Sequence, residues 1–202
     1  RIFKDKEFIE AGATLVDEVS DAQIVLGVKE MPIGYFKEGK AYIFFSHTIK
    51  GQPYNMPLLK DMMASKITLV DYEKIADEEG RRLIFFGRFA GLAGMINSLW
   101  SLGQRLKVNG VETTFTKLKQ THNYNSLDEV KEVVSEIGDD IKINGVHDEI
   151  HPLIVGITGY GNVAKGAQEI MNLLPVEYIK PEDLSTLNER KNLSNKKVYA
   201  VV

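Results

Sequence analysis

The chain has 202 residues, of which 44% are hydrophobic and 26% charged, so we expect one large or two small globular domains and exclude a disordered or fibrous protein. A formal net charge of −3 leaves no broad basic surface for nucleic acid or anionic lipid, and the partners should be small molecules. Cysteine is absent, which excludes disulfides and thiolate metal sites, and no apolar run reaches the roughly 20 residues of a membrane span.

Short apolar runs alternate with amphipathic stretches in the first part of the chain. The pattern predicts a helix over residues 5–12 that stops at Gly12, and a second helix that begins between Pro53 and Pro57. The predicted strands are residues 22–29, 41–47, 66–73 and 81–87. Alternating strands and helices predict a parallel α/β sheet, and the near-continuous apolar runs at 22–29 and 41–47 predict strands that are covered on both faces.

The sequence pattern changes after Gly87 from short alternating runs to one long apolar stretch, and we place the domain boundary there. Residues 88–106 are apolar nearly all round and predict a helix buried in the core. The small residues of this helix, which would let another element approach closely, are Ala90, Gly91, Ala93 and Gly94. Residues 125–138 predict a surface helix with one apolar face, because their valines and Ile137 recur at helical spacing.

A glycine motif follows in the second part. The apolar run 153–158 predicts a buried strand, and the next six residues, "GYGNVA", fit GxGxxA and open an amphipathic helix. In a dinucleotide site Gly159 would permit the tight turn, Gly161 would let the backbone approach a pyrophosphate, and Ala164 would let the helix pack on the strand. The alternative is a glycine turn in an α/β sheet that binds no nucleotide.

The strand "VEYIK" would close this βαβ unit. It ends on Lys180, with Glu177 inside the strand and Glu182 just beyond it. A cation at this place suits a ribose 2′-phosphate better than a 2′-hydroxyl, so the sequence favours NADP(H) over NAD(H).

Titratable side chains stand at the strand ends of the first part. They are Lys29, Glu30, His47, Lys50, Asp71 and Glu73, and Arg82 opens the next predicted strand. Because the carboxyl ends of parallel strands share one edge of a sheet, these groups should gather there, as dehydrogenation at a carbon bearing nitrogen or oxygen requires. Taken singly, His47 could be a hydrogen-bonded structural histidine and each lysine a solvated charge. Their joint position favours a functional site without a metal.

Several stretches together resemble a known family. They are "FFSHTIKGQPYNMPLL", "LVDYEK", "GRRLIFFGRFAGLAGMI", "HNY" and "TGYGNVAKGAQ". In this order they resemble the lysine-2-oxoglutarate reductase domain of aminoadipic semialdehyde synthases and the lysine-forming saccharopine dehydrogenases, within the alanine dehydrogenase and transhydrogenase superfamily. The resemblance implies an enzyme of two Rossmann-like domains with mainly parallel sheets. It also implies that lysine and 2-oxoglutarate are joined as an imine and reduced by NAD(P)H to saccharopine, or that this reaction runs backwards.

The resemblance also assigns roles to residues. Lys29 and His47 match the acid/base pair of the family, Glu30 and Glu73 match carboxylates that tune this pair, and Arg82 matches a contact to a substrate carboxylate. We add Lys50 to the substrate-binding residues. For the cofactor, the resemblance and the glycine motif give Gly159, Gly161, Asn162, Val163, Ala164 and Lys180.

The chain departs from the family at both ends. It lacks a first strand and helix, and the final run "KKVYAVV" looks like the third strand of the nucleotide domain, with later strands absent. We therefore interpret residues 1–88 as an incomplete substrate and catalytic domain, and residues 89–202 as the first half of an NAD(P)-binding Rossmann domain. We expect a fragment that is inactive alone and, by default, cytoplasmic.

Three questions stay open at this point. An alanine dehydrogenase-like enzyme that uses free ammonia is one alternative function, and a non-catalytic nucleotide-binding or sensing module is another. The sequence also leaves homo-oligomerisation open.

Overall fold

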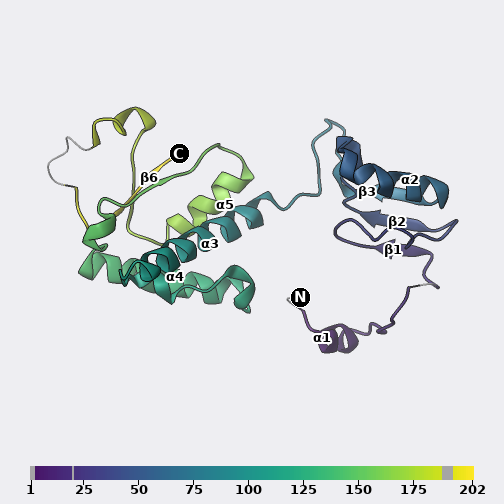
Figure 1. The fold of residues 1–202 in the computed structure, drawn as a ribbon, viewed down its shortest axis with the longest axis horizontal. Coiled ribbons are helices and arrows are strands. Elements are labelled where there is room, and N and C mark those ends of the chain that lie inside the picture. Colours follow the sequence, from purple (N-terminus) through teal and green to yellow (C-terminus); the bar gives the residue numbers. More distant parts are fainter. Residues whose placement is uncertain (1–2, 20, 188–192) are drawn as a thin grey trace. The chain divides into compact units, whose positions relative to one another are not determined.

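The computed structural model describes residues 3–19, 21–187 and 193–202 and divides the chain into two compact units, Phe3–Phe85 and Phe86–Val202 (Figure 1). Each unit holds a three-stranded sheet in which all neighbouring strands are parallel. This confirms the predicted fold class. In the described ranges, no helix is long and apolar enough to cross a bilayer.

The first unit has the sheet order β1-β2-β3, formed by Ile24–Leu26, Ala41–Phe44 and Thr68–Asp71. Its helices are α1 (Asp5–Glu10) and α2 (Met56–Ala64). The predicted stop at Gly12 is confirmed by a φ of +91°, which glycine adopts without steric cost. Pro57 lies in the first turn of α2, where its missing N–H is not needed.

A single face of this sheet is covered. Figure 1 shows α2 lying along the sheet, and the core on that side is formed by Val25, Phe36, Tyr42, Phe44, Leu58 and Met62. On the other face Ile24 and Leu26 are 57% and 69% exposed. The prediction that the strand at 22–29 is covered on both faces is therefore wrong for the described residues, because the packing of α2 accounts for one side only.

The predicted strand at 81–87 does not form. A turn at Asp77, whose carboxylate accepts the Arg81 N–H at 2.8 Å, folds the segment back onto residues 75–76. Arg82 then makes an isolated antiparallel bridge with Ala76 instead of joining the sheet. The apolar side chains that suggested a strand, among them Phe85, are largely exposed.

Three helices form the body of the second unit: α3 (Gly87–Val108), α4 (Leu127–Asn144) and α5 (Asn162–Met171). A Cβ atom built on Gly91 would lie 1.9 Å from the Val163 carbonyl oxygen, and one on Gly166 would lie 2.1 Å from the Arg88 carbonyl oxygen. Helices α3 and α5 thus touch through glycines. The predicted close approach is confirmed at Gly91, whereas Ala90 and Gly94 are exposed and a Cβ atom on Gly94 would meet nothing within 4 Å.

The second sheet has the strand order β4-β6-β5. β4 (Ile154–Gly156) and β5 (Val176–Tyr178) both pair with β6 (Val198–Val201), which lies between them. β6 is the final run of the chain, which the sequence indicated as a strand. The central position goes to the strand that is apolar throughout: Val198 and Ala200 are fully buried, whereas β5 carries Glu177.

Candidate active site

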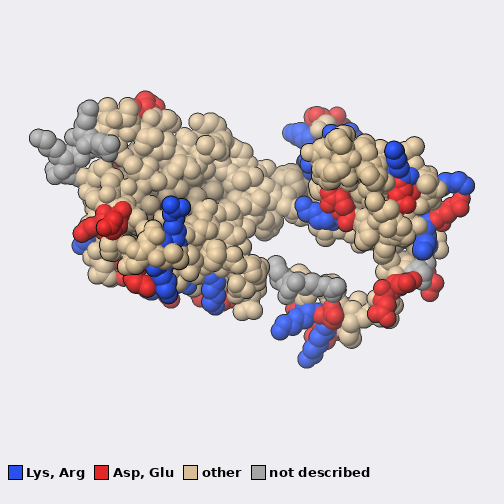
Figure 2. Space-filling view, in the orientation of Figure 1, with Lys and Arg blue, Asp and Glu red and all other residues tan. Residues whose placement is uncertain are grey.

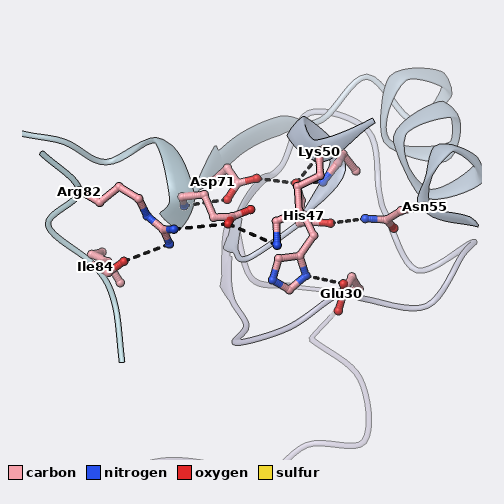
Figure 3. A network of polar contacts seen from close by, with 10 residues as sticks. Glu30, His47, Lys50, Asn55, Asp71, Arg82 and Ile84 are labelled. Carbon is pink, nitrogen blue, oxygen red and sulfur yellow. Dashed lines mark hydrogen bonds and ion pairs between the residues drawn. The ribbon is translucent and has the colours of Figure 1, made fainter. Parts of the chain in front are cut away.

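His47 lies three residues after the end of β2 and immediately precedes the short 3₁₀ helix η1 (Thr48–Lys50). Its ring stacks on that of Phe45, with centroids 6.2 Å apart and planes 16° apart. Its Nδ1 atom makes a hydrogen bond with a carboxylate oxygen of Glu30, which follows β1 (Figure 3). The structure therefore brings together two of the predicted residues from neighbouring strand ends.

The same contact changes the acidity of Glu30. The hydrogen bond from His47 lowers the pKa of this carboxyl group below its usual value, partial burial opposes the shift, and the positive charge of Lys29 lowers the pKa a little further. Glu30 is thus held as a carboxylate near neutral pH, where it can orient the imidazole ring.

Lys29 precedes Glu30 and is exposed. The chain beside it continues the parallel pairing of β1 and β2, because the Phe45 N–H donates to the Val28 carbonyl at 3.1 Å. This pairing fixes the backbone next to Lys29. Among the described residues, none forms a hydrogen bond or an ion pair with the Lys29 ammonium group.

A second cluster surrounds Glu73, in the 3₁₀ helix η3 (Tyr72–Lys74) after β3. The Oε1 atom of Glu73 lies 3.8 Å from Lys50 Nζ and 3.5 Å from Arg82 Nη1. The Glu73 side chain is 10% exposed, and its Oε2 atom is buried without a partner among the described residues. Lys50 and Arg82 are 50% and 46% exposed in their side chains, so both cations are accessible to an anionic substrate.

Four buried polar residues lie between these clusters, and the sequence analysis assigned none of them a role in the site. They are Ser46, Thr48, Asn55 and Asp71, each at most 9% exposed. Asp71 was recognised only as one of the strand-end groups. The available signal was the placement of Ser46 and Thr48 on either side of His47, since hydroxyl groups beside a buried strand need partners.

The glycine turn of the second unit is open to solvent. Residues 158–163 are all exposed, Gly159 has a φ of +91°, and α5 begins directly after Gly161. A Cβ atom on Gly161 would meet nothing within 4 Å, and its φ of −81° does not require glycine. The packing of the described residues therefore does not explain why this position is a glycine.

Lys180 is exposed and follows β5. Because β6 separates β5 from β4, Lys180 belongs to a strand that does not pair with the strand before the glycine turn. The assignment of Lys180 to the ribose stays a prediction.

Comparison with known proteins shows which proteins this chain is similar to. The alanine dehydrogenase/PNT N-terminal domain family matches residues 1–93. Mitochondrial alpha-aminoadipic semialdehyde synthase of Rattus norvegicus is 42% identical over 202 residues, which are all of this chain and 22% of that protein. The chain is similar throughout to aminoadipic semialdehyde synthases. The resemblance indicated by the sequence motifs is thereby confirmed.

Other relatives of the same kind agree. The aminoadipic semialdehyde synthase of Arabidopsis thaliana is 39% identical over 207 residues, covering 100% of this chain and 20% of that protein. The saccharopine dehydrogenase [NAD(+), L-lysine-forming] of Yarrowia lipolytica is 39% identical over 99 residues, covering 46% of this chain and 27% of that protein. The chain thus spans about a fifth of the length of the aminoadipic semialdehyde synthases that it matches.

The expected cytoplasmic location is wrong by this comparison. The similar aminoadipic semialdehyde synthases of Rattus norvegicus, Mus musculus and Bos taurus are mitochondrial proteins. The expectation was a default that is compatible with the absence of cysteine, and the absence of cysteine does not distinguish one reducing compartment from another.

Proposed function

We propose that this chain carries the proton-transfer and substrate-binding groups of a reductase that forms saccharopine from lysine and 2-oxoglutarate. The observation that carries the proposal is the His47–Glu30 pair beside the Lys50–Glu73–Arg82 cluster, at the carboxyl edge of a parallel sheet. The names of the similar aminoadipic semialdehyde synthases and lysine-forming saccharopine dehydrogenases support it.

His47 has a geometry suited to proton exchange. Its Nδ1 is engaged with Glu30, so Nε2 is the nitrogen that can give or take a proton as the substrate amine attacks the ketone and water leaves. Lys29 presents a second amine at the same sheet edge. Arg82 and Lys50, the two partly exposed cations beside Glu73, would hold a carboxylate of 2-oxoglutarate or saccharopine.

The cofactor we propose is a nicotinamide dinucleotide, and its pyrophosphate would lie at residues 159–164. The backbone N–H groups of Asn162, Val163 and Ala164 stand in the first turn of α5 and have no partner within the helix. When bound, the dinucleotide supplies the hydride that reduces the imine carbon.

Within this proposal we keep NADP(H) over NAD(H), on the cation of Lys180 alone. Lys180→Glu should then shift the preference toward NADH by about tenfold or more, because a carboxylate repels a 2′-phosphate and accepts from a 2′-hydroxyl. Equal use of both dinucleotides before and after the change would contradict the NADP(H) preference and leave the rest of the proposal intact.

An assay of the complete gene product tests the function. NAD(P)H oxidation should require lysine and 2-oxoglutarate together and should yield saccharopine. The match to the alanine dehydrogenase family favours one other outcome, oxidation with pyruvate and ammonia instead. Dinucleotide binding without turnover on either pair would indicate a binding module. The same assay on the 202-residue chain tests whether this span is inactive by itself.

A further inference from the structure

The backbone of His47 is in a rare conformation. Its φ of +55° and ψ of +5° lie in the left-handed region, which residues with a side chain seldom occupy. Such a conformation persists only where the surroundings determine it strongly. The residues that hold His47 are therefore part of what fixes its ring against Glu30.

A buried group of hydroxyls flanks His47. Ser46, which is fully buried, donates its hydroxyl proton to the Asp71 carboxylate. Because this proton is used, the Ser46 oxygen accepts from the Thr48 hydroxyl at 2.7 Å and from the Thr48 N–H at 3.2 Å. Both neighbours of His47 are thus turned into the protein, and the imidazole between them is directed to Glu30.

The backbone of Ser46 is fixed as well. The side-chain amide of Asn55 donates to the Ser46 carbonyl oxygen at 2.6 Å, as Figure 3 shows. Asn55 is 4% exposed and precedes α2, so the peptide bond between Ser46 and His47 is tied to a helix end. The chain on the N-terminal side of His47 has little freedom to turn.

Asp71 has a second partner on its other oxygen. Its Oδ1 accepts the backbone N–H of Glu73 at 2.9 Å and so closes the turn that begins η3. Glu73 is the residue paired with Lys50 and Arg82. A single buried carboxylate, 9% exposed, therefore connects the His47 side of the site to the Glu73 side.

We propose that Asp71 is a positioning residue that holds His47 through Ser46 and holds Glu73 through its backbone amide. The consequence for catalysis rests on the proposed function, whereas the effect on the two side chains does not. Asp71 would touch no substrate. Its removal would let His47 leave the left-handed conformation and let Glu73 move relative to Arg82.

Crystal structures of variants of the complete gene product test this directly. Asp71→Ala should separate the His47 ring from Glu30 and displace Glu73. Ser46→Ala should displace only His47, because the Asp71–Glu73 contact does not involve the serine. Asp71→Asn should preserve both positions, since an amide oxygen can accept from Glu73 and its NH₂ can donate to Ser46.

Turnover gives the second measurement. Asp71→Ala and Ser46→Ala should lower kcat about tenfold or more, and Asp71→Asn should restore most of it, because misplacement of a reacting group costs rate. Ser126→Ala is the control: it removes a hydroxyl that accepts a backbone N–H at 3.1 Å, in the second unit. It should leave His47, Glu73 and kcat unchanged.

The outcomes are distinguishable. An unmoved His47–Glu30 pair in Asp71→Ala overturns the proposal, and if that variant does not fold, an unmoved pair in Ser46→Ala overturns it. If the unaltered complete gene product forms no saccharopine, the proposed function is contradicted, and a displaced His47 ring in Asp71→Ala still supports the positioning role.

Discussion

His47 and Lys29 are held differently, although the family resemblance pairs them. The imidazole is stacked on Phe45 and bonded to Glu30, while the Lys29 side chain is exposed at the sheet edge. His47 therefore has a direction fixed by its contacts, whereas the described residues do not fix the direction of the Lys29 side chain.

Replacing either residue should lower turnover. In the complete gene product we expect His47→Gln and Lys29→Met each to reduce kcat by about 10²-fold or more while substrate binding changes less, as loss of a positioned proton-transfer group does. Steady-state kinetics with lysine and 2-oxoglutarate measure this. Near-normal kcat in both variants would make these residues structural.

The acidity of Glu30 predicts a pH dependence of stability. Its pKa is lowered in the folded state, mainly by the hydrogen bond from His47, so its stabilising contribution is present above the usual carboxyl pKa and is lost as the pH falls through the lowered value. Glu30→Gln should therefore reduce the free energy of unfolding at pH 7 and have a shrinking effect below about pH 4. Chemical denaturation at several pH values measures it. An effect that grows toward low pH would have the wrong sign.

At the scale of elements, Gly166 in α5 and Gly161 just before it have different surroundings. Gly166 is required by the contact with α3, because its Cβ atom would lie 2.1 Å from the Arg88 carbonyl oxygen. Gly161 precedes the helix in an extended conformation that valine adopts readily, with open space around it.

These two glycines should respond oppositely to substitution. Gly161→Val should retain the stability of the fold and abolish NAD(P)H binding, since the side chain would occupy the space of the pyrophosphate. Gly166→Val should destabilise the protein by about 1–3 kcal/mol through overpacking. Thermal unfolding and NADPH fluorescence titration separate the two effects. Unchanged dinucleotide affinity in Gly161→Val would exclude residues 159–164 as the nucleotide site.

Across the whole molecule, sequence patterns predicted local structure better than strand partners. Helical spacing, prolines in a first turn and an all-round apolar stretch located α1 through α5, and apolar runs located the strands, because all these signals are local. The run 81–87 was misread because its apolar side chains are exposed, and the central place of β6 depends on pairing that no local pattern encodes.

In the site, too, local patterns could be predicted from the sequence but contacts that depend on strand pairing could not. The strand-end residues could be predicted because parallel strands end at one edge. The buried contact between Ser46 and Asp71 could not, because it joins positions 25 residues apart in sequence and depends on how β2 and β3 pair. Figure 2 adds that acidic and basic residues are intermixed on the visible face, consistent with the near-balanced composition.

Hydride transfer to the carbon that was the ketone of 2-oxoglutarate is the central claim, and an isotope label tests it directly. The complete gene product is given lysine, 2-oxoglutarate and NAD(P)H that carries deuterium at the transferable position of the nicotinamide ring. We predict saccharopine that contains deuterium at that carbon, with transfer greatly slowed in His47→Gln. Saccharopine without deuterium, or no saccharopine from the unaltered protein, would contradict the account.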